Sequence, residues 1–197
     1  MRVNIGLNTL ELARGDITRE DTEAIANAAN SALAGGGGSA SPTGLAGETS
    51  PLRGGVDGAI HRAAGPSLMK ELREKYPDGC PTGSAVITTG GTLGAKWVLH
   101  AVGPRYHGMP EDAELLASAY RSCLALCGER GIRSIAFPSI STGIYGYPLN
   151  EAAPIALRTV AGFLKEHENP ALVRFVLFDE GTFAAYSAAM RDCGLLA

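Results

Sequence analysis

The stretch Gly54-Gly-Val-Asp-Gly-Ala-Ile-His-Arg-Ala-Ala-Gly65 is the most informative part of this 197-residue chain. Its glycines predict a turn that runs into a short apolar helix, because glycine adopts backbone conformations closed to other residues. Asp57 occupies the position of a helix N-cap, and His61 follows four residues later on the same helical face. A helix start offers free N–H groups to an anion. The segment therefore predicts a phosphate-binding turn with a carboxylate beside it.

Composition places the chain among ordinary globular proteins. Hydrophobic residues make up 45%, charged residues 19%, and the formal net charge is −3. No basic block stands out, which disfavours a nucleic-acid partner. The first residues lack an apolar signal core, and no stretch approaches the roughly 18 apolar residues of a membrane span. We expect a single domain over residues 1–197, cytoplasmic and without a membrane partner.

The four cysteines show no clear metal-binding pattern. Cys80, Cys123, Cys127 and Cys193 form no Cys-x-x-Cys pair. Cys123 and Cys127 have the spacing that brings two side chains together on a helix, but buried, reduced thiols are the favoured interpretation. Neither a metal nor a cofactor is expected.

Strand and helix patterns alternate along the chain. Apolar or alternating runs predict strands at 5–12, 23–27, 85–88, 97–102, 132–137 and 172–178. Helical patterns with start or stop signals lie at 68–76, 111–131, 148–167 and 183–193. This alternation predicts a layered α/β sandwich with a mixed or largely parallel sheet.

Further polar segments follow the expected strands, where open α/β sheets bind their ligands. Asp16 can accept a hydrogen bond from an amino group such as that of adenine, or it can cap a turn or helix. Asn27 and Asn30 offer donors and acceptors to a sugar diol, although asparagine also favours turns. The loop 139–146 can form a nest of N–H groups for an anion, with Tyr145 against a sugar, or be a plain connection.

Together these motifs resemble the macrodomain family, specifically its MacroD-type branch. The resemblance covers essentially the whole chain and is carried by segments 15–18 (GDIT), 27–30 (NAAN), 54–65, 80–83 (CPTG), 100–104 (HAVGP) and 136–146 (AFPSISTGIYG). It implies a three-layer α/β/α sandwich around a mixed, largely parallel sheet, with ADP-ribose as ligand. MacroD-type members resemble hydrolases that remove ADP-ribose from mono-ADP-ribosylated acidic side chains and deacetylate O-acetyl-ADP-ribose.

The resemblance also implies a role for individual residues. Asp16 would hold the adenine amino group with support from the Ile17 N–H, and Phe178 would lie near the adenine. Asn27 and Asn30 would bind the ligand, with Asn30 at the distal ribose. The two walls of the diphosphate and ribose cradle would be Gly55, Val56 and Asp57 on one side and Ser141, Thr142, Gly143, Ile144 and Tyr145 on the other.

Ester hydrolysis at the ribose requires an activated water, and Asp57 is the carboxylate in the glycine loop that can orient or deprotonate it. His61, one turn later, would hydrogen-bond Asp57 or the ribose region. The expected catalytic residues are therefore Asp57, His61 and Asn30, and no metal is required. Whether Asp57 deprotonates the water or only orients it stays open at this point.

The chain departs from the family pattern in one place, an insertion of about 37–53 between the glycine run 33–36 and segment 54–57. It is expected to be flexible. It would act as a lid, be a segment without a role, or displace Asp57 and leave a binder without turnover.

The alternatives to a hydrolase are accordingly an ADP-ribose-binding reader module and a phosphatase acting on ADP-ribose 1″-phosphate. The expected partners are ADP-ribose and either ADP-ribosylated proteins or O-acetyl-ADP-ribose.

Overall fold

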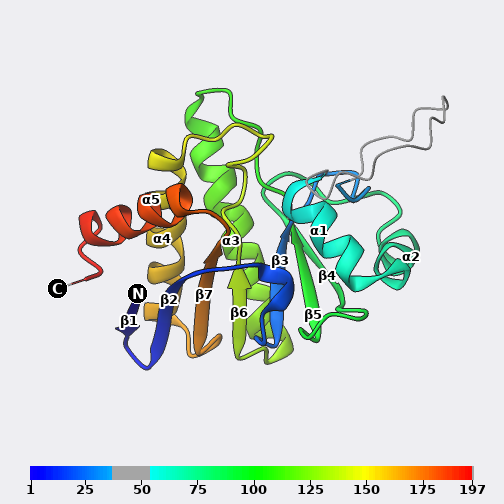
Figure 1. Cartoon of the computed structure of the whole chain (residues 1–197), viewed down its shortest axis with the longest axis horizontal. Coiled ribbons are helices and arrows are strands. Elements are labelled where there is room, and N and C mark those ends of the chain that lie inside the picture. Colours follow the sequence, from blue (N-terminus) through cyan, green and yellow to red (C-terminus); the bar gives the residue numbers. More distant parts are fainter. Residues whose placement is uncertain (37–53, 197) are drawn as a thin grey trace.

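The computed structural model describes residues 1–36 and 54–196. The elements, in chain order, are β1 (Arg2–Ile5), β2 (Asn8–Arg14), the 3-10 helix η1 (Ile17–Arg19), β3 (Ala24–Ala28), α1 (Gly55–Ala64), α2 (Pro66–Lys75), β4 (Ala85–Thr89), β5 (Trp97–Ala101), α3 (Pro110–Arg130), β6 (Ser134–Phe137), α4 (Leu149–Glu166), β7 (Leu172–Leu177) and α5 (Glu180–Asp192). The described strands form one seven-stranded sheet in the order β1-β2-β7-β6-β3-β5-β4 (Figure 1).

The sheet is mixed. Strands β2, β7, β6, β3 and β5 are parallel to their neighbours in this order, while β1 and β4 pair antiparallel at the two edges. This confirms the predicted α/β sandwich around a mixed, largely parallel sheet. Because parallel strands end at the same edge of a sheet, the loops after β3, β5 and β6 meet there.

Helices cover both faces of the sheet (Figure 1). Helices α3, α4 and α5 enclose the larger core, where Tyr120, Phe137, Phe175 and Tyr186 are fully buried against one another. Helices α1 and α2 pack on the other face over β3 and β5, around a smaller apolar cluster. The site-bearing helix α1 is thus held against the centre of the sheet.

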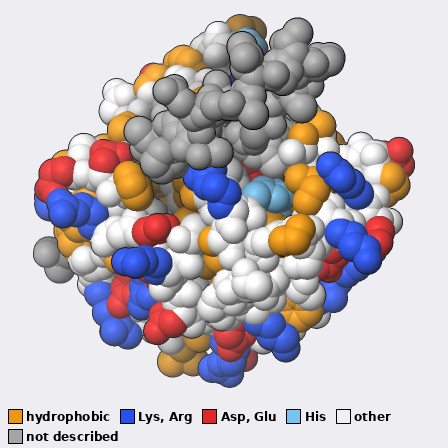
Figure 2. Space-filling model, turned by 45° about the vertical axis from the view of Figure 1, so that its right-hand side comes forward, with side chains coloured by type: hydrophobic (Ala, Val, Ile, Leu, Met, Phe, Trp, Pro, Cys, Tyr) orange, Lys and Arg blue, Asp and Glu red, His pale blue; other side chains and the backbone are white. Residues whose placement is uncertain are grey.

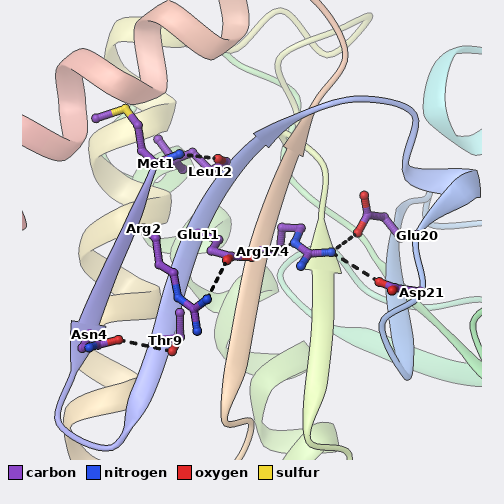
Figure 3. Close-up of polar contacts among 9 residues, drawn as sticks. All are labelled: Met1, Arg2, Asn4, Thr9, Glu11, Leu12, Glu20, Asp21 and Arg174. Carbon is purple, nitrogen blue, oxygen red and sulfur yellow. Dashed lines mark hydrogen bonds and ion pairs between the residues drawn. The ribbon is translucent and has the colours of Figure 1, made fainter.

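Beside α1, the same sheet face carries charged side chains. Figure 3 shows Arg174 of β7 between Glu11 of β2 and the pair Glu20 and Asp21. The guanidinium donates to Glu11 at 2.8 Å and to Glu20 at 2.7 Å, and these two carboxylates raise the pKa of Arg174. On the face drawn in Figure 2, Lys and Arg are interspersed with Asp and Glu among the described residues, in keeping with the small net charge.

The prediction of one strand at 5–12 is wrong. Gly6 has a φ of +62°, and the chain reverses at Gly6 and Leu7 to form the antiparallel pair β1–β2. A glycine at positive φ provides the turn that two short strands need, whereas the apolar alternation continues across it.

The described helices include none that is both long and apolar enough to span a membrane.

Candidate active site

A cleft of about 310 Å³ opens at the edge of the sheet where the parallel strands end. Its described walls come from the end of β3 and the segment after it, the start of α1, the segment after β5 and the loop after β6. The lining residues are Ala28, Ala29, Asn30, Gly35, Gly36, Gly54, Gly55, Val56, Asp57, Gly103, Arg105, Ser139, Ile140, Ser141, Gly143, Ile144 and Tyr145. Segments far apart in the chain therefore converge on one cavity.

Asp57 lies within the first turn of α1, and the prediction that it is the N-cap is wrong. The N-cap is Gly54, with a φ of +94°, and Gly55 follows at +53°. Because glycine tolerates these conformations, the N-cap lies three residues earlier than the side-chain pattern suggests. An acidic residue in the first turn is stabilised there by the helix dipole, and the N–H groups of this turn have no partner within the helix.

The predicted insertion at 37–53 lies outside the described residues, but the residues that flank it are close in space. A Cβ on Gly36 would overlap the carbonyl oxygen of Gly54 and lie 2.9 Å from its Cα. The two backbones thus touch, and only glycine permits this approach. Gly36 and Gly54, which the insertion separates in the sequence, are therefore adjacent in space at the N-terminus of α1.

Asp57 is buried, with 7% of its surface exposed, and two side chains hold it. The Asn27 amide donates to Asp57 Oδ1 at 2.7 Å, and His61 Nε2 lies 3.2 Å from the same oxygen. The predicted pairing of Asp57 with His61 on one helical face is confirmed. Oδ2 makes no hydrogen bond to another described residue.

The loop after β6 forms the wall opposite α1. Ser141 adopts a φ of +67°, which is uncommon for a non-glycine residue, and its buried hydroxyl has no partner among the described residues. The loop is folded back by a hydrogen bond from the Tyr147 N–H to the Ser141 carbonyl at 3.0 Å. An unusual backbone and an unpaired buried hydroxyl at a cleft point to a ligand-binding role.

The structure brings most of the predicted site residues together. Those lining the cleft are Asn30, Gly55, Val56, Asp57, Ser141, Gly143, Ile144 and Tyr145. Asn27 and His61 contact Asp57 but do not line the cleft. Thr142 is also outside the lining, and its hydroxyl donates to Ser139 Oγ at 2.8 Å.

The residues predicted for the adenine lie outside this cleft. Asp16 caps η1 by accepting from the Thr18 N–H at 2.9 Å, which is the capping role that the sequence left as an alternative. Ile17 is buried in the smaller core. Phe178 is 72% exposed at the end of β7. Their roles toward adenine stay predictions.

Arg105 is the most informative lining residue that the sequence reasoning missed. Its guanidinium lies 4.7 Å from the centre of the Tyr145 ring, a cation–π distance. Among the described lining residues it is the only cationic side chain. It directly follows the 100–104 motif, so its position after a strand end was a usable signal.

Comparison with known proteins places the chain in a family. The family model described as Macro domain matches residues 26–156. A protein of Salmonella gallinarum named O-acetyl-ADP-ribose deacetylase is 47% identical over 189 residues, covering 94% of this chain and 96% of the relative. A macro domain-containing protein of Streptomyces nogalater is 43% identical over 190 residues, covering 94% of both chains.

Solved structures of macrodomains resemble this chain in both sequence and fold. The Oceanobacillus iheyensis macrodomain with ADP is 44% identical, with a TM-score of 0.85 over 98% of this chain and 95% of that one. The Trypanosoma brucei macrodomain in complex with ADP-ribose is 39% identical, with a TM-score of 0.78 over 92% of this chain and 68% of that one. By sequence along nearly its full length and by fold, this chain belongs to the macro domain family.

Proposed function

We propose that this chain hydrolyses esters of ADP-ribose, deacetylating O-acetyl-ADP-ribose and releasing ADP-ribose from mono-ADP-ribosylated acidic side chains. The names of the Salmonella relatives support the first reaction. The observation that carries the proposal is the buried Asp57 carboxylate on the cleft wall, held through one oxygen by Asn27 and His61.

In this proposal the ligand lies between α1 and the loop after β6. The diphosphate is bound by the unpaired N–H groups in the first turn of α1 and by the Ser141 hydroxyl, which has no described partner. Asn30 and Tyr145 hold the distal ribose, and the adenine lies toward Asp16. This places the reacting ester near Asp57.

Asp57 acts on water rather than on the ligand directly. With Oδ1 held by Asn27 and His61, Oδ2 accepts a hydrogen bond from the water that attacks the ester. His61, 3.2 Å from Oδ1, keeps the carboxylate in one rotamer. A positioned base of this kind typically contributes about 10²–10⁴-fold to the rate.

The test compares the wild-type protein with Asp57→Asn, which keeps the size of the side chain and an oxygen for the Asn27 amide. Calorimetry measures ADP-ribose affinity, and release assays use O-acetyl-ADP-ribose, a peptide with mono-ADP-ribosylated glutamate and ADP-ribose 1″-phosphate. We expect wild-type turnover of the two carboxylic esters, at least about 10²-fold slower turnover by Asp57→Asn, and little change in affinity.

Each contrary result has a defined meaning. Turnover of Asp57→Asn close to that of the wild type would reject Asp57 as the residue that activates water. ADP-ribose binding without turnover would leave the reader function, and cleavage of the phosphate ester alone would leave the phosphatase. If the wild-type protein showed no ADP-ribose binding and no turnover, the proposal as a whole would be overturned.

A further inference from the structure

A chain of buried polar side chains continues behind Asp57, away from the cleft. His100 of β5 is fully buried, as are Asn27 of β3 and Thr88 of β4 to within 1%. His100 Nδ1 lies 3.1 Å from Asn27 Nδ2, and His100 Nε2 lies 2.9 Å from Thr88 Oγ1. The strands β3, β5 and β4 are neighbours in the sheet, and Asn27 is directly opposite His100 in the register.

The donors and acceptors in this chain allow one arrangement. A carboxylate only accepts hydrogen bonds, so the end of the Asn27 amide that faces Asp57 at 2.7 Å is its NH2 group. The second hydrogen of that NH2 group points to His100 Nδ1, which must therefore be an unprotonated acceptor. The ring proton is then on Nε2 and is donated to Thr88 Oγ1.

The charge state of His100 agrees with this arrangement. Burial, with a smaller contribution from nearby His61, lowers the pKa of His100 from 6.5 to about 3. The ring is neutral at physiological pH, so its two nitrogens differ and only one can accept.

The carbonyl end of the Asn27 amide shows that neighbouring residues fix the orientation of this side chain. Asn27 Oδ1 is buried and has no partner among the described residues. Without these neighbours, the amide would adopt an orientation in which its oxygen accepts a hydrogen bond, because an unpaired buried acceptor costs about 1–3 kcal/mol. Asp57 and His100 together hold the amide in this orientation.

We propose that His100, in its Nε2–H form, is a positioning residue for Asp57, and that the Thr88 hydroxyl stabilises this form by accepting a hydrogen bond from Nε2–H. The inference rests on the proposed role of Asp57 in ester hydrolysis. Without the Thr88 hydroxyl, the buried Nε2–H has no acceptor, which disfavours the Nε2–H form by about 1–3 kcal/mol. The competing Nδ1–H form places a donor against the Asn27 NH2 group. The Asn27 amide then turns so that its oxygen faces both His100 and Asp57. Asp57 loses the hydrogen bond from Asn27, and the amide oxygen repels its carboxylate.

The test variant is Thr88→Val, which removes the hydroxyl but keeps the branched shape of the side chain. The matched control is Thr22→Val, because Thr22 is also buried and its hydroxyl donates to the Ala24 carbonyl at 2.8 Å. Thr22 lies just before β3, whereas Asn27 lies near the end of that strand, so the control removes a buried hydroxyl away from Asp57.

We expect Thr88→Val to lower kcat for O-acetyl-ADP-ribose between about 10-fold and 10²-fold, because a small misplacement of a catalytic group has effects of this size. KM and ADP-ribose affinity should change less than about twofold, since neither Thr88 nor His100 lines the cleft. Thr22→Val should keep the kcat and KM of the wild type. A purely structural role of Thr88 would lower thermal stability in both variants and leave kcat unchanged.

A second measurement reports on His100 directly. Long-range ¹H–¹⁵N spectra of the histidine rings distinguish the two neutral forms, and we expect the Nε2–H form in the wild type and in Thr22→Val. In Thr88→Val we expect a mixture of the two forms or the Nδ1–H form.

The outcomes separate this inference from the proposed function. An Nδ1–H ring in the wild type, or an unchanged kcat in Thr88→Val, would overturn the positioning role while ester hydrolysis by the wild type still stands. No ester hydrolysis by the wild type would reject the proposed function, and the positioning role with it, even if the ring form is as expected.

Discussion

Replacing Gly103 with alanine tests how tightly the cleft wall is packed. A Cβ at Gly103 would overlap Ser141 Oγ and lie 2.5 Å from Ile140 Cγ2, about 1 Å short of ordinary carbon contact. Ile140 has little room to retreat, because it is 1% exposed and its N–H donates to the Tyr120 hydroxyl at 3.1 Å. Overpacking of this kind costs about 1–3 kcal/mol. In a domain of this size the melting temperature falls by about 2–4 °C per kcal/mol, so we expect a fall of about 2–12 °C.

The same change should weaken ADP-ribose binding, because Ser141 must move to accommodate the new methyl group. The matched control for stability is Gly143→Ala in the loop after β6, where a Cβ meets no atom within 4 Å and φ is not positive. That substitution should change stability by less than about 0.5 kcal/mol. Differential scanning calorimetry and titration calorimetry measure both effects. If Gly103→Ala melts and binds like the wild type, the close packing of this wall is refuted.

Three further predictions follow from the described contacts. Arg105→Gln should lower ADP-ribose affinity and make it less sensitive to salt, because it removes the cation beside Tyr145; calorimetry at two ionic strengths measures this, and an equal salt dependence would contradict it. Gly162→Ala, at an exposed helical site with open space around it, should raise stability by about 0.4–1 kcal/mol in a thermal melt, and a lower melting temperature would argue against it. A thiol reagent should modify Cys193 first, since the other three cysteines are buried and burial raises their thiol pKa, that of Cys127 to about 12; peptide mass analysis showing early labelling elsewhere would reject this.

The helices and apolar strands were predictable because their signals are local. The helix expected at 111–131 is α3, Pro110–Arg130, with proline in its first turn and Gly131 in the left-handed conformation at its C-cap. The strand at 172–178 is β7, Leu172–Leu177, an interior strand of the sheet with β2 on one side and β6 on the other. The error at 5–12 came from apolar alternation that continues through a turn at Gly6.

Within the site, local spacing predicted one contact and missed another. Asp57 and His61 are one helical turn apart, so their pairing follows from helix geometry alone. The contact between Asn27 and Asp57 joins residues 30 positions apart and depends on α1 packing over β3. No periodicity in the chain encodes it.

The sequence by itself determined most element types, the glycine turn that opens α1 and the family, because these depend on short-range periodicity, turn chemistry and motif order. Only the tertiary structure decided that the backbones of Gly36 and Gly54 touch. It also decided that Asn27 and His100, 73 positions apart, form a hydrogen bond behind Asp57. These contacts arise when parallel strands are aligned side by side, and strand order and register are properties of the whole folded chain.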